Sequence, residues 1–296
     1  MINVLSSILK SSRPKQWVKN FVIFLPMVFS FNESWFVEDF WGIFFTSFNA
    51  FVGFVLISSS IYLLNDSLDI RLDQNHPIKK YRPIASGKLS VFFARISSLI
   101  IGLIALFFAF FIGLDFLFAM ISYLLIMFGY VFMFRNIFIL DVVSISTGFI
   151  IRVLSGALAI EIPMSNWLYI CTALGALFIA LSKRYSEKLH SSKSNETRDS
   201  LYNYELGKLK VTLVIISLFI AIVYFSYTLL AENLPSNNLM VVSAAFVFCG
   251  LFRYLYLVVY KGQGEKPEDI IMKDIIILPS IFVWVIYTFG VLFWFR

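Results

Sequence analysis

Three aspartates stand at helical spacing in the stretch NDSLDIRLD, residues 65–73. If the apolar segment before them continues as a helix, Asp66, Asp69 and Asp73 occupy positions i, i+3 and i+7 on one face, with Asn65 at its edge. Carboxylates this close repel one another unless a cation neutralises them. A hard divalent ion with oxygen ligands does so, and Mg²⁺ commonly shares carboxylates with substrate phosphates. The pattern predicts a Mg²⁺ site on these three aspartates for a phosphorylated substrate.

Cations follow the aspartates at once. Lys79, Arg82 and Lys88 come after His76-Pro77, which should end the helix because the residue before proline is driven out of the α region. Guanidinium and ammonium groups bind phosphate oxygens, so we expect these three side chains to hold substrate phosphates. The alternative is a solvated loop whose acids balance its bases. The helical register of the aspartates at the end of an apolar segment favours the metal site.

The composition is that of an integral membrane protein. Hydrophobic residues make up 59% and charged residues 14% of the 296 residues, against roughly 45–50% and 25% in soluble domains. Because a spanning helix needs about 20 mainly apolar residues, we predict a single all-α domain, residues 1–296, with nine transmembrane helices. They are expected at 14–32, 40–64, 91–112, 115–134, 137–160, 166–183, 211–231, 238–260 and 275–295.

Basic residues are distributed unequally between alternate connections. With the N-terminus in the cytoplasm, all of the 24 Lys and Arg except Arg152 and Arg296 fall on the cytoplasmic side, as the positive-inside rule predicts. The odd number of crossings then places the C-terminus outside the cytoplasmic (inner) membrane. The long cytoplasmic loops, about 65–90, 184–210 and 261–274, hold most of the other polar residues. We therefore expect the chemistry on the cytoplasmic face.

An arginine lies well inside the predicted span 137–160. Arg152 is some fifteen residues into the span 137–160, where a charge costs about 2.5–3.5 kcal/mol on insertion scales. Asp141 shares nearly the same helix face, but three turns away, about 16 Å at 1.5 Å per residue, so it cannot be the direct partner. We expect a substrate phosphate or an acid from another helix to serve. A purely structural ion pair is the alternative.

The start of the first predicted span carries another polar group. Lys15 and Lys19 would share one face of an α-helix as an i, i+4 pair, and Asn20 follows them. Together with Arg13, these three side chains are expected to receive a lipid phosphate at the inner leaflet. Anchoring to lipid headgroups, with Trp17 at the interface, explains the same residues equally well.

The aspartate motif NDSLDIRLD, with HP at 76–77 and RPIASG at 82–87, resembles the first aspartate-rich motif of the UbiA superfamily of intramembrane prenyltransferases. The resemblance implies nine transmembrane helices around a cavity open to the cytoplasmic side, and an assembly of identical chains. In the aromatic prenyltransferases of this superfamily, a second aspartate-rich motif binds Mg²⁺ after the sixth helix. Here that position reads SKRYSEKLH, residues 182–190, with Glu187 as its only acid.

Other motifs resemble the polyprenyl-phosphate phosphoribosyltransferases of the same superfamily: RPKQWVKN at 13–20, IR at 151–152, IPMSNW at 162–167, KRY at 183–185 and PEDI at 267–270. This resemblance implies transfer of 5-phosphoribosyl from phosphoribosyl pyrophosphate to decaprenyl phosphate or a similar lipid, with Mg²⁺ on the leaving pyrophosphate. It implies catalytic roles for Asp66, Asp69, Lys183 and Arg184. Tyr185 is expected beside them, holding the donor from the opposite side of the cavity.

Two other functions compete with this interpretation. Prenyl transfer from a prenyl diphosphate to an aromatic or lipid acceptor requires the second acidic motif, which the chain lacks. A transporter would spread charges through the membrane, often with inverted repeats, whereas the charges here collect at one end. Nothing predicts a nucleic-acid partner.

The acids of the loop 261–274 have two possible interpretations. Glu268, Asp269 and Asp274 offer ligands for a ribose hydroxyl or a second metal. They equally suit the N-terminus of a helix, where negative charge meets the helix dipole.

Overall fold

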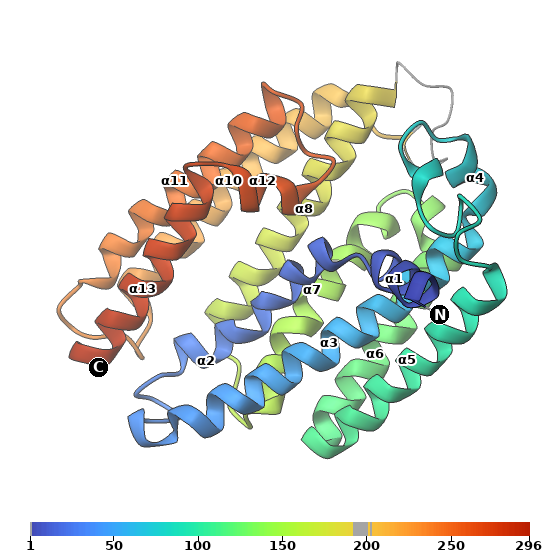
Figure 1. The fold of residues 1–296 in the computed structure, drawn as a ribbon. Helices are drawn as coiled ribbons and strands as arrows, with labels where there is room; N and C mark the ends of the chain where they lie inside the picture. The colour runs from blue at the N-terminus through green and yellow to red at the C-terminus, as the bar shows by residue number, and fades with distance from the viewer. Residues whose placement is uncertain (1, 192–200, 202) are drawn as a thin grey trace.

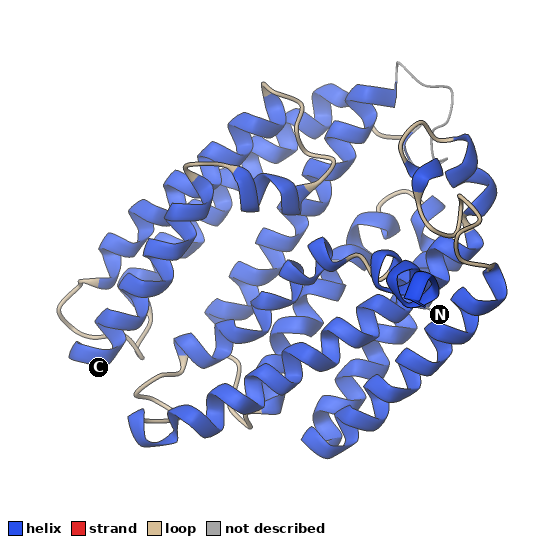
Figure 2. Ribbon diagram, viewed as in Figure 1, coloured by secondary structure: helices blue, strands red, loops and turns tan. Residues whose placement is uncertain are grey.

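The computed structural model describes residues 2–191, 201 and 203–296. Within these residues every regular element is a helix, apart from one isolated bridge between Phe31 and Trp35 (Figure 1, Figure 2). Part of the predicted loop 184–210, with its cations Lys193 and Arg198, lies outside the described residues.

Eight helices are long and apolar enough to span a membrane, in agreement with an integral membrane protein. They are α3 (Phe40–Leu68), α5 (Val91–Ile112), α6 (Leu114–Phe132), α7 (Leu140–Ala159), α8 (Asn166–Ser191), α10 (Leu206–Leu230), α11 (Met240–Val259) and α13 (Ile277–Phe295). The shorter elements are α1 (Ile2–Ser11), η1 (Pro14–Phe24), α2 (Leu25–Phe29), η2 (Val37–Asp39), α4 (Ile70–Asn75), η3 (Lys79–Tyr81), η4 (Phe134–Asn136) and α12 (Pro267–Lys273). The eight spans predicted between residues 40 and 295 are confirmed.

The predicted first span, residues 14–32, is broken, so the count of nine is not confirmed in the described part of the chain. The segment forms the 3₁₀ helix η1 followed by the short helix α2. η1 packs against both α3 and α7, and it approaches α7 very closely at Gly156. A Cβ atom added at Gly156 would lie 2.1 Å from the carbonyl oxygen of Ile23. The missing side chain of this glycine lets the two backbones touch.

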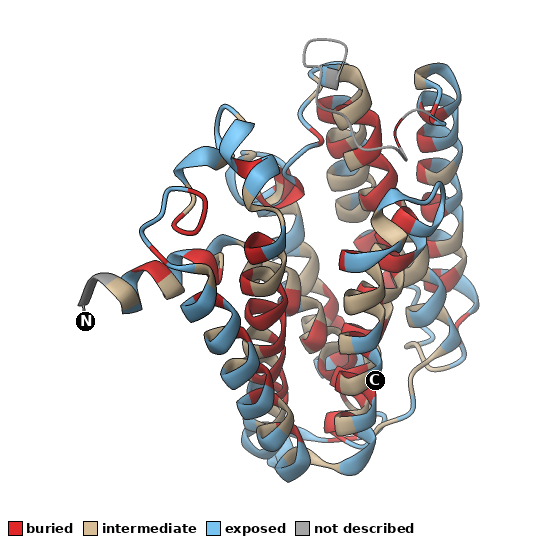
Figure 3. Ribbon diagram, turned by 90° about the vertical axis from the view of Figure 1, so that its right-hand side faces the viewer, coloured by how far each residue is buried: buried red, intermediate tan, exposed pale blue. Residues whose placement is uncertain are grey.

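The short connections make successive spans antiparallel. Helices α3, α6, α8 and α11 end on the side where α5, α7, α10 and α13 begin, and we call this side the polar end. Helix α4 lies at this end and the C-terminus at the opposite end (Figure 1). Buried residues face the inside of the bundle, and exposed ones face outwards and gather at its ends (Figure 3). The side chains described below therefore meet where the spans converge at the polar end.

Candidate active site

The acidic segment keeps its helical register across a break. Helix α3 ends at Leu68, but the Asp69 amide still donates to the Asn65 carbonyl (3.0 Å) and the Asp73 amide to the Asp69 carbonyl (2.8 Å). The segment stops at His76, whose extended conformation (φ −80°, ψ 134°) follows from the proline after it. The prediction that His76-Pro77 ends the helix is confirmed.

Two of the three aspartates share one arginine. Nη1 of Arg82 lies 3.1 Å from Oδ1 of Asp66 and 2.7 Å from Oδ2 of Asp73. Arg13 donates a second, close hydrogen bond to Asp66. Both carboxylates are almost fully buried, whereas each arginine side chain is about a quarter exposed, at 25% and 26%. We call these four side chains, Arg13, Asp66, Asp73 and Arg82, the open cluster.

Asp69 lies apart from the other two. Its Oδ1 and Oδ2 atoms are each 2.8 Å from Nη1 of Arg135, which also lies 3.5 Å from the Asn65 side-chain oxygen. The three carboxylates therefore do not contact one shared cation in this structure, and binding of one Mg²⁺ by all three stays a prediction. Asp69 sits at the break between α3 and α4 (φ −90°, ψ 15°), so its carboxylate is directed to a different cation from that of Asp66 and Asp73.

The donor set of the open cluster fits Mg²⁺ shared with a diphosphate. No group of three His, Cys, Asp or Glu that could hold a metal ion occurs in the part of the chain that the structure describes. Asp66 and Asp73 nevertheless converge on a single guanidinium nitrogen, where a divalent cation would meet two carboxylates. Mg²⁺ typically takes one or two carboxylates from a protein and its other ligands from water and phosphates.

The 3₁₀ conformation of η1 decides which of its side chains face the polar end. With three residues per turn, positions i, i+3 and i+6 fall on one face, and these are Arg13, Gln16 and Lys19. Arg13 reaches Asp66, while Gln16 donates to Glu268 of α12 and Lys19 Nζ lies 3.3 Å from the Glu268 Oε2 atom. The face therefore connects the open cluster to α12.

The same geometry corrects the expectation for Lys15. In a 3₁₀ helix, residues four apart do not share a face, so Lys15 and Lys19 point in different directions. Lys15 is exposed, and Lys19 is half-buried. Arg13, at the start of η1, adopts a left-handed conformation (φ 53°). Non-glycine residues rarely do so, and such strain often accompanies functional sites.

Arg152 is buried between neutral groups. It donates to the side-chain oxygen of Asn20 (2.7 Å), the hydroxyl of Tyr123 (2.7 Å) and the carbonyl of Gly148 (2.8 Å). Its guanidinium carbon also lies 4.7 Å from the centre of the Tyr123 ring. None of these partners is an acid, so the expected acid from another helix is not found among them. As predicted, Asp141 is not its partner.

Arg184 takes part in a second cluster, in which its own side chain and that of Asp141 are closed to solvent. Its side chain is fully buried, with Nε 3.0 Å from Oδ2 of Asp141 and a close hydrogen bond to Glu187. The Tyr204 hydroxyl donates to Oδ1 of Asp141 (2.8 Å). We call Asp141, Arg184, Glu187 and Tyr204 the closed cluster. Burial, together with the bond to Asp141, raises the pKa of Tyr204 above its ordinary value, so this hydroxyl stays protonated and keeps donating.

The neighbours of Arg184 point elsewhere, because successive residues of an α-helix are about 100° apart. Lys183 is about one-third exposed and lies 3.9 Å from Glu187. Tyr185 is buried in the apolar core with residues of α8, α10 and α11. This burial does not support a contact of Tyr185 with the donor, and that contact stays a prediction.

The remaining predicted cations lie in the connection between α4 and α5. Lys79 begins η3 and is half-buried, while Lys88 is exposed shortly before α5. Arg82 is the member of the predicted set that the structure brings into the open cluster.

Comparisons with known proteins agree with this architecture. The sequence model of the UbiA prenyltransferase family matches residues 23–268. The chain belongs to this family. It is 30% identical over 299 residues to decaprenyl-phosphate phosphoribosyltransferase of Corynebacterium glutamicum, covering 96% of this chain and 86% of that protein. It is 28% identical over 295 residues to the protein of the same name from Mycolicibacterium smegmatis, covering 96% and 91%.

Solved structures of UbiA-type proteins share the fold. A UbiA homolog from Archaeoglobus fulgidus bound to GPP and Mg²⁺ gives a TM-score of 0.71 at 16% identity, over 97% of this chain and 99% of that chain. A digeranylgeranylglyceryl phosphate synthase gives a TM-score of 0.68 at 14% identity, over 99% of both chains. The predicted fold class, all-helical and UbiA-like, is confirmed.

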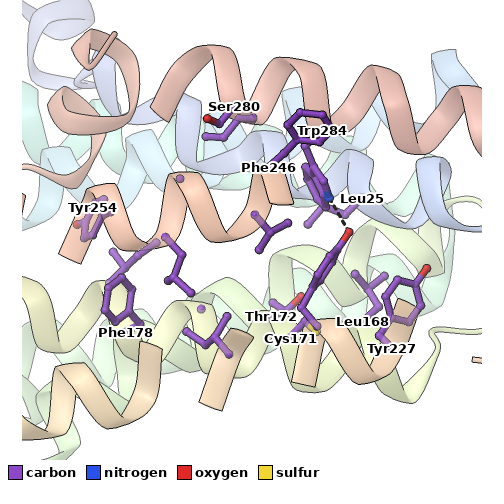
Figure 4. Close-up of a pocket in the computed structure, with 18 of the residues that line it drawn as sticks. Leu25, Leu168, Cys171, Thr172, Phe178, Tyr227, Phe246, Tyr254, Ser280 and Trp284 are labelled. Carbon is purple, nitrogen blue, oxygen red and sulfur yellow. Dashed lines mark hydrogen bonds between the residues drawn. The ribbon is translucent and has the colours of Figure 1, made fainter. Parts of the chain in front are cut away.

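This UbiA-family protein also contains a cavity of about 370 Å³ that is lined mainly by apolar side chains of α8, α10, α11 and α13. Figure 4 shows Tyr254 and Phe178 towards one side of the cavity and Trp284 on another. Trp284 donates a hydrogen bond of 2.6 Å to the Tyr224 hydroxyl, which lies 2.9 Å from the Ser243 hydroxyl. The linked polar atoms leave the rest of the lining suited to a hydrocarbon chain.

Sequence reasoning missed or left open three residues of the polar end. Arg135 was counted only as a loop cation, although it is the one cation in its short connection. Gln16 gave no signal, because a glutamine next to an aromatic residue suits many surfaces. Glu268 could not be separated from Asp269 and Asp274 by sequence. Asp269 pairs with Lys273, and Asp274 pairs with Arg253 and accepts the amides of Ile276 and Ile277 at the start of α13.

Proposed function

We propose that this protein transfers a 5-phosphoribosyl group from phosphoribosyl pyrophosphate to a polyprenyl phosphate, with Mg²⁺ as cofactor. The observation that carries the proposal is the contrast between its two clusters. In the open cluster, two buried carboxylates pair with arginines that are about a quarter exposed, whereas Arg184 of the closed cluster is fully buried, and the closed cluster occupies the position of a second acidic motif. One metal site surrounded by cations suits two phosphorylated substrates better than two metal sites. The names of the two relatives support the same reaction.

The roles at the donor side follow from position. Asp66 and Asp73 would hold Mg²⁺ on the pyrophosphate, with Asp69 and Asn65 acting beside Arg135. When the donor binds, Arg82 would exchange its two carboxylates for phosphate oxygens, to which it can donate in a bidentate manner. Lys79, Lys88 and Lys183 are proposed as further phosphate contacts.

The reaction needs no general base, because a phosphate monoester is already an anion near neutral pH. An oxygen of the lipid phosphate attacks the anomeric carbon of the pentose, the bond from that carbon to the pyrophosphate oxygen breaks, and pyrophosphate leaves with its electron pair. Bound Mg²⁺ supplies charge neutralisation on this leaving group. The side chains of the chain supply orientation and fixed positive charge, which are the main sources of rate in such a displacement.

The acceptor side is proposed to follow η1 and the apolar cavity. We treat Lys19, Asn20 and Arg152 as one polar path, because Asn20 follows Lys19 in η1 and accepts a hydrogen bond from Arg152, while Lys15 is exposed on another face of η1. The lipid phosphate would bind on this path, and part of its isoprenoid chain would occupy the cavity beside Trp284.

The alternative role of Arg184, as a structural support, fits its complete burial better than direct contact with substrate.

Topology is part of the proposal. A single domain in the cytoplasmic (inner) membrane, with the polar end and N-terminus in the cytoplasm and the C-terminus outside, places the polar end where a soluble phosphorylated donor is available. Assembly of identical chains remains a prediction from the family resemblance.

Incubation of the purified protein in nanodiscs with Mg²⁺, phosphoribosyl pyrophosphate labelled in the ribose and decaprenyl phosphate tests the function. We expect label in the lipid fraction and an equal amount of pyrophosphate. The second candidate is transfer of a prenyl chain from a prenyl diphosphate, which the family name and the apolar cavity favour. A parallel reaction with labelled geranyl diphosphate and an aromatic acceptor examines it. Consumption of the prenyl donor with no labelled pentosyl lipid would reject our assignment.

A further inference from the structure

Glu268 is an acid buried at the polar end outside both clusters. It is only 6% exposed, on the seven-residue helix α12. Its two oxygens face η1, where one accepts from Gln16 and the other lies 3.3 Å from Lys19 Nζ. A buried carboxylate is costly unless its environment compensates it, so this inward position calls for an explanation.

The other acids of the same loop are accounted for by local structure. Asp269 forms an i, i+4 pair with Lys273 on α12. Asp274 pairs with Arg253, which holds the pKa of the Asp274 carboxyl below its ordinary value, and its side chain caps α13. Glu268 instead keeps acceptor capacity, because its Oε2 atom is 3.3 Å from Lys19 Nζ as an ion pair but meets no hydrogen-bond geometry among the described residues. An ionised carboxylate offers about four acceptor positions.

The face of η1 sets the position of Glu268 relative to the open cluster. Arg13 contacts Asp66, while the residues one and two turns later contact Glu268. At about 2.0 Å of rise per residue, these contact points are separated by roughly 6–12 Å along η1. If the pyrophosphate is held at Asp66 and the pentose extends along η1, its hydroxyls would come near Glu268.

We infer that Glu268 accepts hydrogen bonds from the ribose hydroxyls of the donor and thereby selects a pentosyl donor. This inference rests on the proposed function and adds the contact that distinguishes the donor class. A carboxylate is the acceptor that nucleotide-binding folds use for a ribose hydroxyl. A prenyl diphosphate carries the same pyrophosphate but no hydroxyl, so it would leave the remaining acceptor positions of the buried carboxylate unfilled.

The test compares two donors on the full-length protein in nanodiscs: phosphoribosyl pyrophosphate and its 2-deoxyribosyl counterpart. The measured quantity is the ratio of their kcat/KM values with the same decaprenyl phosphate. In the Glu268→Gln variant, the ratio of kcat/KM for the ribosyl donor to that for the deoxyribosyl donor should be about tenfold lower than in wild type. The reason is that a charge-assisted hydrogen bond becomes a neutral one. The two donors differ in intrinsic reactivity, but this difference is the same for every variant and cancels when the ratio of a variant is compared with that of wild type. Asp269→Asn, in the same short helix, should leave the ratio unchanged.

Other outcomes overturn the inference in recognisable ways. An equal fall in kcat/KM for both donors would make Glu268 a structural partner of Lys19. An unchanged ratio with a higher Mg²⁺ requirement would make it a metal ligand. Wild-type protein that transfers neither pentosyl group would reject the proposed function itself. If Glu268→Gln fails to fold, Glu268→Asp keeps the charge but withdraws the carboxylate by one methylene. In that variant too the ratio should fall several-fold, and an unchanged ratio would reject the contact.

Discussion

The open and closed clusters both pair arginine with two acids, but they differ in the burial of the arginine. In the open cluster, Arg82 is 26% exposed and bridges two carboxylates. In the closed cluster, Arg184 is 0% exposed and lies between Asp141 and Glu187. An arginine in contact with solvent can exchange a carboxylate for a phosphate ligand. A fully enclosed one cannot do so without leaving a buried charge unpaired.

This difference teaches that a basic residue near a membrane surface is not by itself a substrate contact. Arg82 and Arg184 belong to equally suggestive sequence motifs, yet only one of them is placed to exchange partners. The comparison predicts that substitutions in the open cluster act on catalysis and those in the closed cluster act on stability.

The largest effect is expected at the open cluster. Asp66→Asn should lower transfer by about 100-fold or more, because the charge that would hold Mg²⁺ is lost, while Arg82 keeps Asp73 as a partner. The measurement is pentosyl transfer to lipid at increasing Mg²⁺, with size-exclusion elution as a check of folding. Chelation of divalent ions should have the same effect on wild type. Asp115→Asn, exposed in the first turn of α6, is the control, and full activity in Asp66→Asn would contradict the assignment.

The closed cluster should respond in stability. Arg184→Met leaves Asp141 buried without its cation, which costs about 3–5 kcal/mol when one partner of a buried pair is removed. Thermal unfolding in detergent should occur at a clearly lower temperature. The double variant with Asp141→Asn should regain part of this loss, since the orphaned charge is then gone. A stable Arg184→Met protein that lacks only activity would place Arg184 among the substrate contacts instead.

An intermediate effect is expected where η1 touches α7. Gly156→Ala must push the Ile23 carbonyl away, at a cost of about 1–3 kcal/mol for overpacking. The shift also moves Arg13 relative to Asp66, so transfer should fall along with the unfolding temperature. Gly290→Ala, where an added Cβ has nothing within 4 Å, is the matched control. Equal behaviour of the two alanine variants would mean that η1 is not held by this contact.

The smallest effect on stability is expected at Lys183, the neighbour of Arg184 in sequence. Lys183→Gln should change the free energy of unfolding by no more than about 0.5 kcal/mol, because its partly exposed pair with Glu187 contributes little. If Lys183 holds a donor phosphate, KM for phosphoribosyl pyrophosphate should rise about tenfold through loss of a charge-assisted bond. Steady-state kinetics at saturating lipid measure this. An unaltered KM would remove Lys183 from the donor site.

Much of the fold follows from local composition. Span 91–112 was predicted with the bounds that α5 has, because length and hydropathy of a spanning helix are properties of consecutive residues. The break within 14–32 was not predictable in this way. Its 3₁₀ conformation accompanies close packing on α3 and α7, and the residue that permits this contact, Gly156, is far away in the chain.

The sequence by itself determined that the protein is a helical membrane protein, where its spans lie and which aspartates share a helical register. Only the tertiary structure decided that Asp69 pairs with Arg135, that Tyr185 enters the core and that Glu268 faces Gln16, which is 252 residues away. The physical reason is that membrane insertion depends on the hydropathy of a continuous segment. Ion pairing depends instead on distances between side chains of different helices, which are fixed when the bundle packs.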